Sequence, residues 1–195
     1  MKAYYDARAP EYDDVWLGRG RFAHRHGSDW FEEVTHLLGA IASLPAARTL
    51  DVACGTGFLT RHLHGDVTGL DQSPQMLDEA RRKLPDAHFV QGDALELPFP
   101  NDSFDRLFTS FYYGHLEVGD RRRFIGECRR VSRELVFVDA SRDRAEVDAE
   151  HQERVLDDGS RWSVYKRYFR AEELAHELGG GEVIHAGRWF VMARA

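Results

Sequence analysis

Two glycines that follow a strand-like segment are the first residues whose spacing suggests chemistry. The run TLDVACGTG, residues 49–57, leads from β-branched and aliphatic residues directly into Gly55 and Gly57. A glycine-rich turn after a parallel strand lets the backbone approach a ligand closely at the carboxyl edge of the sheet. The dinucleotide-binding pattern would require a third glycine at position 60, where this chain has Thr60. The turn therefore predicts a ligand site of a different kind.

Three carboxylates follow or end the predicted strands around this turn. Asp51 stands inside the strand just before the glycines, where a carboxylate suits a cation better than a phosphate. Asp71 ends the next strand, and a carboxylate at that tip can accept hydrogen bonds from both hydroxyls of a ribose. Asp93 and the backbone of Ala94 could accept from the amino group of an adenine and donate to its ring nitrogen. The set predicts a nucleoside with a positively charged part.

The elements that must position these groups alternate between strands and helices. Buried, non-alternating strands joined by helices indicate a mostly parallel sheet with helices on both faces. We expect strands over 48–53, 66–71, 88–93, 103–111 and 134–141. We expect helices over 28–44 with Ser28 as cap, over 58–64, over 73–84 with Ser73 as cap and Pro74 in the first turn, and over 120–131.

The C-terminal part has a different pattern. Residues 142–158 are rich in charge and are predicted to be helical, followed by a strand over 160–169 and a helix over 171–178 that ends at glycines. The final run EVIHAGRWFVMARA holds two strands too close for a crossover helix, so they must pair antiparallel. The predicted fold is α/β: a doubly wound, mostly parallel seven-stranded sheet with a C-terminal antiparallel hairpin, in one domain over residues 1–195.

Composition limits the partners and the compartment. The 195 residues carry a formal net charge of −7, which disfavours nucleic acid and anionic membranes as partners. No signal-peptide-like run and no apolar run of about 18 residues is present, so we expect a cytoplasmic protein. The histidine pairs His24/His26 and His62/His64 have a spacing that does not put both rings on one side of a helix, so no metal is expected.

Several motifs together resemble a known family. LDVACGTG, GLDQSPQML, FVQGDALELPFPNDSFD and the terminal hairpin are similar to those of class I S-adenosylmethionine-dependent methyltransferases, in the same order. The opening YYDARAPEYD resembles the small-molecule members related to the quinone-biosynthesis C-methyltransferases. The resemblance implies a Rossmann-like methyltransferase fold, S-adenosyl-L-methionine as cofactor and a small-molecule methyl acceptor.

The resemblance also implies roles for individual residues. The glycines would pass under the methionine part of the cofactor, Asp51 would face its ammonium group, and Asp71 would bind the ribose. Residues toward the adenine would pack on its face or read its edge, one serine would lie near the sulfonium, and two N-terminal tyrosines would close over the carboxylate end. The implied cofactor-binding set, in chain order, is Tyr5, Tyr12, Asp51, Ala53, Gly55, Gly57, Asp71, Gln72, Met76, Asp93, Ala94 and Ser110.

Methyl transfer from a sulfonium is an in-line displacement, so the enzyme must align the acceptor and exclude water. A base helps only where the acceptor has a proton to lose. The segment TSFYYGHLE after the fourth strand offers Tyr113 and His115 as catalytic candidates, and it lacks the Asn/Asp-Pro-Pro-aromatic pattern of amide N-methyltransferases. Residues 1–27 and 141–170 are expected to fold over the cofactor as a lid and form the acceptor pocket. The acceptor, the methylated atom type and the oligomeric state stay open.

Other interpretations stay open beside this one. The chain could be a nicotinamide-dependent oxidoreductase on a related sheet, or a non-catalytic module that binds S-adenosylmethionine. Met76 and the N-terminal tyrosines could simply pack in the core, and His115 could be an ordinary loop histidine. The arginines at 121–123 and 129–130 are typical of a solvated helix face.

Overall fold

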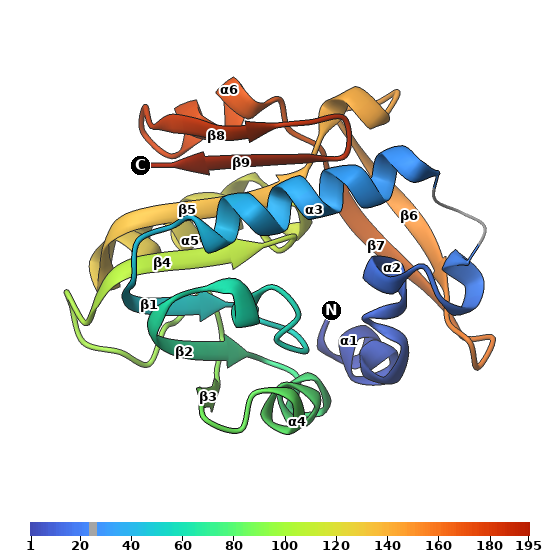
Figure 1. Cartoon of the computed structure of the whole chain (residues 1–195), viewed down its shortest axis with the longest axis horizontal. Coiled ribbons are helices and arrows are strands. Elements are labelled where there is room, and N and C mark those ends of the chain that lie inside the picture. The colour runs from blue at the N-terminus through green and yellow to red at the C-terminus, as the bar shows by residue number, and fades with distance from the viewer. Residues whose placement is uncertain (24–26) are drawn as a thin grey trace.

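Seven strands form one sheet in the order β3-β2-β1-β4-β5-β9-β8, seen in the computed structural model of Figure 1, which describes residues 1–23 and 27–195. The first five are parallel, whereas β9 runs antiparallel to both β5 and β8. The predicted fold class and its C-terminal hairpin are confirmed. The strands are β1 (Ala47–Val52), β2 (Gly65–Asp71), β3 (His88–Gln91), β4 (Phe104–Ser110), β5 (Ser132–Ala140), β8 (Glu182–Ala186) and β9 (Phe190–Arg194).

Helices cover both faces of this sheet because successive strand residues point to opposite sides. In β4, Leu107 packs with the α5 and α6 side chains, while its neighbour Phe108 packs with α3. The α-helices are α1 (Lys2–Arg8), α2 (Asp14–Leu17), α3 (Ser28–Ala42), α4 (Pro74–Lys83), α5 (Val118–Val131) and α6 (Ala171–Glu177). The short 3-10 turns are η1 (Ala9–Glu11), η2 (Gly20–Phe22), η3 (Thr60–His62), η4 (Tyr113–His115) and η5 (Arg142–Arg144).

The strand order reverses between β1 and β4, which are neighbours in the sheet. In doubly wound sheets the carboxyl ends of the strands on both sides of such a reversal leave a crevice for a ligand. The topology thus brings the ends of β1, β2 and β4 together at one edge. These are the ends that the glycine turn and Asp71 follow or occupy.

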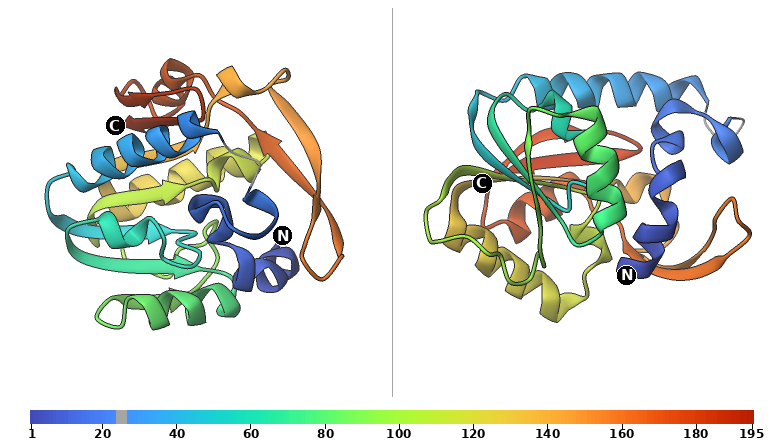
Figure 2. Two further views of the ribbon diagram at one scale, coloured as in Figure 1. Left: turned by 45° about the vertical axis from the view of Figure 1, so that its right-hand side comes forward. Right: turned by 90° about the horizontal axis from the view of Figure 1, so that it is seen from below.

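Two segments outside the sheet meet at that same edge. The N-terminal helices lie beside the hairpin formed by β6 (Ala149–Val155) and β7 (Arg161–Arg167), as both views of Figure 2 show. Their contact is a small apolar cluster in which Tyr4 joins Leu156 and Val164. The Tyr4 ring also lies 5.9 Å from that of Trp162. The two segments expected outside the core therefore pack on each other.

The predicted helix over 142–158 is wrong. The segment contains η5 and then β6, which pairs with β7 along its full length from Ala149 to Val155. Exposure alternates along β6 because one face of the hairpin turns inward and the other faces solvent. The many charged residues suggested a solvated helix, but they occupy both the outer face and the polar inner face of a two-stranded ribbon.

Two smaller local predictions also differ from the structure. The helix over 58–64 is reduced to η3, because Phe58, Leu59 and Leu63 all turn toward the α3 side of the core and the next strand begins at Gly65. Ser28 is the first residue of α3, and Gly27 occupies the cap position. Ser73 does cap α4, since its hydroxyl accepts from the Met76 amide.

Within the described ranges, no helix has the length and apolar run needed to cross a bilayer. Over the same ranges, no three His, Cys, Asp or Glu side chains group as metal ligands would. His24 and His26 lie outside the described residues. Cys54 and Cys128 are buried free thiols.

Candidate active site

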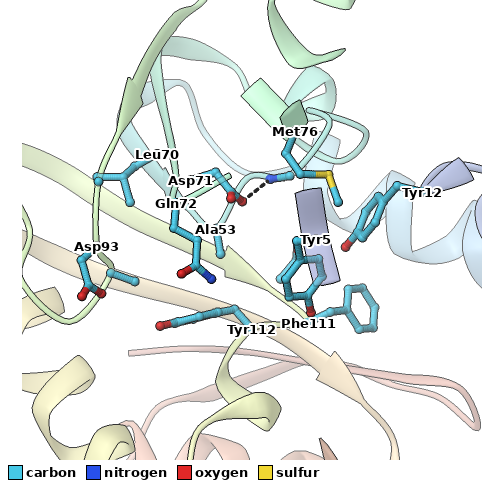
Figure 3. Close-up of a pocket in the computed structure, with 14 residues that line it drawn as sticks. Tyr5, Tyr12, Ala53, Leu70, Asp71, Gln72, Met76, Asp93, Phe111 and Tyr112 are labelled. Carbon is cyan, nitrogen blue, oxygen red and sulfur yellow. Dashed lines mark hydrogen bonds between the residues drawn. The ribbon is translucent and has the colours of Figure 1, made fainter. Parts of the chain in front are cut away.

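A cavity of about 500 Å³ opens at the carboxyl ends of β1, β2 and β4 (Figure 3). We call it the cofactor cavity. Ten of the residues named by the resemblance line it, together with four that were not in that set. The lining residues are Tyr5, Tyr12, Ala53, Gly55, Leu70, Asp71, Gln72, Met76, Gly92, Asp93, Ala94, Ser110, Phe111 and Tyr112.

The turn after β1 is strongly bent. Ala53, Gly55 and Gly57 all have positive φ, at 58°, 55° and 76°. Gly55 lies at the cavity under the ring of Tyr12, which an added Cβ would meet at 3.5 Å. Gly57 does not line the cavity, and its added Cβ would lie 3.0 Å from the Leu84 side chain near the end of α4. The first glycine exposes backbone to the ligand, and the second lets the turn pack against α4.

Asp71 holds this edge together. One of its carboxylate oxygens accepts from the Gly55 amide at 3.0 Å and the other from the Ser73 amide at 2.8 Å. A carboxylate has about four acceptor positions, so each oxygen retains capacity for a ligand hydroxyl. Burial raises the pKa of Asp71, while these amide hydrogen bonds oppose the rise. Asp71 thus ties the turn to α4 and still faces the cavity.

Asp51 lies behind the turn and does not line the cavity. Its side chain is 1% exposed, one oxygen accepts from the Thr60 hydroxyl at 2.6 Å, and Oδ1 has no partner among the described residues. Burial, followed by the charge of Asp71, raises the pKa of Asp51 to about 7. An acceptor atom buried without a donor is costly unless a ligand or water supplies one. Thr60 stands where a dinucleotide turn would have its third glycine, and its hydroxyl holds the Asp51 carboxylate in place by this hydrogen bond.

The opposite end of the cavity is set by β2 and the loop after β3. Figure 3 places Asp93 and Leu70 together at this end, with Met76 across the cavity beside Tyr12. Met76 is fully buried and also lines the cavity, so core packing and ligand contact both apply. Asp93 is exposed and uses one oxygen to accept from the Leu95 amide at 2.9 Å, which shapes its loop.

The N-terminal segment is fastened over the turn by two carboxylates. Asp6 accepts from the Ser73 hydroxyl at 2.6 Å, next to Asp71. Asp13 accepts from the Thr56 hydroxyl of the glycine turn and from Lys83 at 2.6 Å. These contacts hold Tyr5 and Tyr12 against the cavity.

A second cavity of about 690 Å³ adjoins the first, and we call it the acceptor cavity. Aromatic and cationic side chains dominate it. It is lined by Tyr5, Arg8, Tyr12, Val15, Trp16, Trp30, Phe111, His115, Ala140, Arg144, Gln152, Arg154, Lys166, Tyr168 and Phe190. Tyr5, Tyr12 and Phe111 line both cavities and form the wall between them.

His115 lies in the acceptor cavity with a defined tautomer. Its Nδ1 is 2.6 Å from the carbonyl oxygen of Tyr165, and a carbonyl only accepts, so Nδ1 carries the proton and Nε2 keeps its lone pair. Burial, followed by the charge of Lys166, holds the pKa of His115 well below its usual range. Both effects favour the neutral imidazole, whose Nε2 lone pair can accept a hydrogen bond from a ligand.

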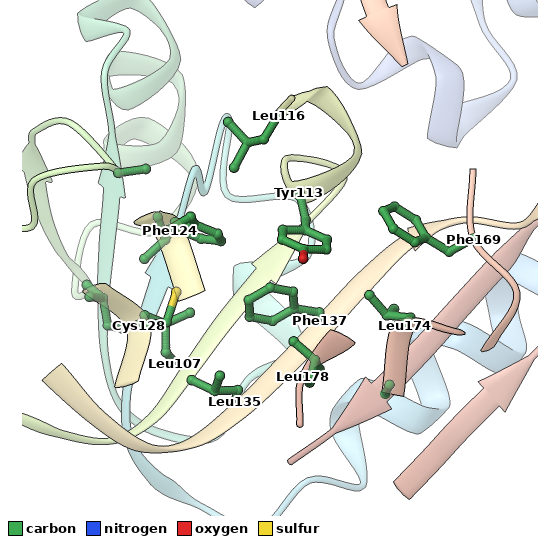
Figure 4. Close-up of a cluster of buried hydrophobic side chains, with 14 of the residues drawn as sticks. Leu107, Tyr113, Leu116, Phe124, Cys128, Leu135, Phe137, Phe169, Leu174 and Leu178 are labelled. Carbon is green, nitrogen blue, oxygen red and sulfur yellow. The ribbon is translucent and has the colours of Figure 1, made fainter. Parts of the chain in front are cut away.

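The structure does not bring Tyr113 to either cavity. Its ring lies in the core between Phe124, Phe137 and Phe169 (Figure 4), and its hydroxyl donates to Glu177 at 2.6 Å. Burial raises the pKa of this phenol, followed by the hydrogen bond to Glu177. Of the two candidate catalytic residues, only His115 lines one of these two cavities.

Sequence reasoning missed several lining residues. Arg8 follows Tyr4 at a helical spacing of four, which could have shown that it shares the inner face of α1. Arg154 and Lys166 carried no such signal, because their segments were assigned to different kinds of element. Phe111 adopts a positive φ of 55°, which turns the chain after β4 and is not visible in its residue type.

The sheet order and this arrangement of cavities define a Rossmann-like methyltransferase fold. Residues 49–135 match the family model described as a methyltransferase domain. Over these residues the chain resembles the class I S-adenosylmethionine-dependent methyltransferases, and its residues fit the cofactor of that class. The features that fit are the unpartnered Asp51 Oδ1, the free acceptor positions of Asp71 and the backbone of Gly55, which lines the cavity.

Known proteins resemble the chain in sequence and in structure. It is 41% identical over 107 residues to a demethylmenaquinone methyltransferase of Thermotoga maritima, covering 52% of this chain and 44% of that protein. It is 36% identical over 139 residues to the enzyme of that name from Renibacterium salmoninarum, covering 68% and 54%. The chain thus spans about half the length of these curated relatives. The solved DhpI–SAM–HEP complex superposes with a TM-score of 0.75 at 27% identity, covering 98% and 94%.

Proposed function

We propose that this chain transfers a methyl group from S-adenosyl-L-methionine to a small-molecule acceptor. The observation that carries the proposal is the pair of adjoining cavities that share a wall of three aromatic rings. The first has the acidic and glycine-rich lining that suits the cofactor, and the second has room for an acceptor. The solved DhpI complexes, whose descriptions name SAM or SAH, and the relatives named as methyltransferases support it.

The cofactor would be held by the residues around Asp71. Asp71 accepts from the ribose hydroxyls, Gly55 presents backbone to the methionine part, and Asp51 Oδ1 accepts a hydrogen bond from the ammonium group directly or through water. Asp93 and Ala94 read the adenine edge. Met76 packs on the adenine face, and Leu70, which lines the same cavity, is a second apolar neighbour of the ring.

When bound, S-adenosylmethionine supplies a methyl group made electrophilic by a positively charged sulfur. The chain contributes alignment and the exclusion of water, which together can lower the barrier substantially. Ser110, the last residue of β4, lines the cofactor cavity, and Phe111, which follows it, lines both cavities. Tyr5 and Tyr12 cover this point from the N-terminal segment. We propose residues 1–23 and 141–170 as the lid that keeps the site dry.

His115 is the proposed base for an acceptor that must lose a proton. Its Nδ1–H is held by the Tyr165 carbonyl, which aims the ring and leaves Nε2 as the acceptor atom. An acceptor without such a proton would not need it. The acidic composition further supports a cytoplasmic protein without a nucleic-acid or membrane partner, which we also propose.

Calorimetry with S-adenosylhomocysteine and NADH tests the proposal against its alternatives. We expect a heat of binding with the demethylated cofactor and none with NADH, because Thr60 removes the third glycine of the dinucleotide turn. If the protein binds NADH and does not bind S-adenosylhomocysteine, the proposal is wrong and the chain is better explained as an oxidoreductase. Binding of S-adenosylhomocysteine without methyl transfer to any acceptor in a broad panel would support a non-catalytic binding module.

A further inference from the structure

The acceptor cavity carries a charge opposite to that of the chain. The protein has a formal net charge of −7, yet this cavity is lined by Arg8, Arg144, Arg154 and Lys166. No aspartate or glutamate is among its described lining residues. A cleft lined by one sign of charge between low-dielectric walls attracts ligands of the other sign. The cofactor cavity next to it shows the reverse, with Asp71 and Asp93 and no lysine or arginine in its described lining.

Arg8 stands out among the buried cations. Arg106 pairs with Glu134, Arg121 with Glu177 and Lys166 with Asp139. Arg8 is 8% exposed, forms no ion pair within the described ranges, and its Nε has no hydrogen-bond partner there. Its one side-chain hydrogen bond goes to the neutral hydroxyl of Tyr4 at 2.7 Å.

The rings around Arg8 compensate its burial only in part. Its guanidinium carbon lies 4.9 Å from the Tyr12 ring centre and 5.7 Å from that of Tyr4. Such cation–π contacts stabilise a guanidinium less than a carboxylate does. A buried charge without a counter-charge is strongly unfavourable, so an anionic ligand is the missing partner that this position fits.

Arg154 lines the same cavity as Arg8, from the β6–β7 hairpin. It lies on the inner face of β6, where Glu150 and Gln152 alternate with outward residues. Its Nε is also buried without a partner, and its guanidinium donates to the Gln152 side chain and to no carboxylate of the described chain. Glu150 accepts from the Tyr168 hydroxyl and from Gln152, each at 2.7 Å.

The other wall of the cavity is apolar. Trp16, Trp30 and Phe190 belong to the core cluster beneath α3, and Phe111 closes the side toward the cofactor cavity. The Trp16 ring stacks on Phe58 at 5.2 Å, so this wall is fixed by packing. The cavity thus has one aromatic side and one cationic side.

We propose that the methyl acceptor is a small molecule with an apolar body and an oxyanion head group, a carboxylate or a phosphate, held by Arg8 and Arg154. This inference rests on the proposed function, because it names the class of molecule that the acceptor cavity takes. It separates the chain from an enzyme for a neutral acceptor such as a quinone ring. The cationic residues lie outside residues 49–135, the part that matches the methyltransferase domain family.

The test titrates the protein saturated with S-adenosylhomocysteine with matched pairs of ligands. The carboxylate arm compares 4-hydroxybenzoate with 4-hydroxybenzamide, and the phosphate arm compares phenyl phosphate with phenol. Calorimetry measures affinity, and quenching of tryptophan fluorescence reports contact with Trp16 and Trp30. We expect at least one anion to bind 10-fold or more tightly than its neutral partner, and the arm that succeeds identifies the head group.

Variants identify the residues responsible. Arg154→Gln should weaken binding of that anion at least 5-fold and leave affinity for S-adenosylhomocysteine within 2-fold. Arg161→Gln is the matched control, because Arg161 lies on the same hairpin, is exposed and pairs with Glu153. It should change neither affinity.

The outcomes separate the two proposals. If the folded wild-type protein does not bind S-adenosylhomocysteine, the proposed function is wrong. If that ligand binds but neither anion binds more tightly than its neutral partner at millimolar concentration, the oxyanion inference is overturned. Equal anion binding by wild type and Arg154→Gln overturns it as well.

Discussion

The two cavities differ in where their residues come from and in their charge. The cofactor cavity is built mainly from β1, β2, β4 and the loops that follow them, within a single stretch of the chain. The acceptor cavity is assembled from α1, α2, α3, the β6–β7 hairpin and β9, which lie far apart in the sequence. The first is acidic and the second is basic. In the proposed function, the sheet edge provides a fixed site for a cationic cofactor, and the chain outside the core selects the acceptor.

Replacing Asp71 with alanine should have the largest effect, because it removes ligand contacts and the carboxylate that ties Gly55 to Ser73. We expect the affinity for S-adenosylhomocysteine to fall roughly 100-fold, or about 3 kcal/mol. Calorimetry measures this loss. The control is Asp66→Ala, an exposed acid on the same strand, which should leave the affinity unchanged. Equal loss in both variants would show that strand charge in general, and not this carboxylate, holds the cofactor.

Arg8 and Arg106 compare an unpaired buried cation in the acceptor cavity with a paired one in the core. Arg106→Met breaks the contact with Glu134 and should reduce the free energy of unfolding by about 2 kcal/mol. Arg8→Met removes an uncompensated charge and should leave stability unchanged or raise it. Urea denaturation monitored by circular dichroism measures both. A loss in Arg8→Met as large as in Arg106→Met would mean that Arg8 serves packing and not a ligand.

The raised pKa of Asp51, beside the cofactor cavity, can be tested through the pH dependence of the free energy of unfolding. Its pKa is raised to about 7, so the folded protein binds more protons than the unfolded chain between about pH 4 and pH 7. The stability that this group contributes is therefore present at low pH and is lost as pH rises through 7. An asparagine at this position cannot ionise, so the stability of Asp51→Asn relative to wild type should rise by at least about 1 kcal/mol from pH 5 to pH 8. Urea denaturation at both pH values measures the difference.

A difference between wild type and Asp51→Asn that does not change with pH would contradict a raised pKa. The same titration with saturating S-adenosylhomocysteine sharpens the comparison. A ligand ammonium near Asp51 favours the ionised acid. It should therefore reduce the rise in stability of Asp51→Asn relative to wild type between pH 5 and pH 8.

Asp13 should have the smallest effect, because it fastens the N-terminal segment and touches neither ligand. Asp13→Ala removes the contacts with Thr56 and Lys83 and should speed dissociation of S-adenosylhomocysteine about 5-fold, or roughly 1 kcal/mol. Stopped-flow fluorescence measures the rate. The neighbouring Asp14→Ala is the control, since its side chain forms no hydrogen bond or ion pair within the described residues. An unchanged dissociation rate in Asp13→Ala would contradict the proposal that the N-terminal segment acts as a lid.

The sequence allowed prediction of the sheet, its terminal hairpin and most of the cofactor cavity. Gly55, Asp71 and Asp93 could be identified because each ends or follows a strand in a local pattern. The sequence did not show that Gly57 packs against α4 or that Asp51 is shielded behind the turn. Both facts depend on what lies behind the β1 turn, which the local pattern does not contain.

The acceptor cavity could not be predicted in the same way. Arg154 lies in a segment whose charged residues suggested a helix, and its inward direction depends on pairing with β7. Tyr113 and His115 are only two residues apart, yet η4 turns one into the core and the other into the cavity. The direction of each of these side chains depends on how separate elements pack together. Residue spacing along the chain does not show that packing.

The shared wall of Tyr5, Tyr12 and Phe111 has a consequence for how the two ligands bind. Rings that face both cavities cannot shift toward one occupant without changing the space left for the other. Linkage then requires donor and acceptor to alter each other's affinity by the same factor. Three aromatic side chains would therefore couple the affinity for the donor to the affinity for the acceptor.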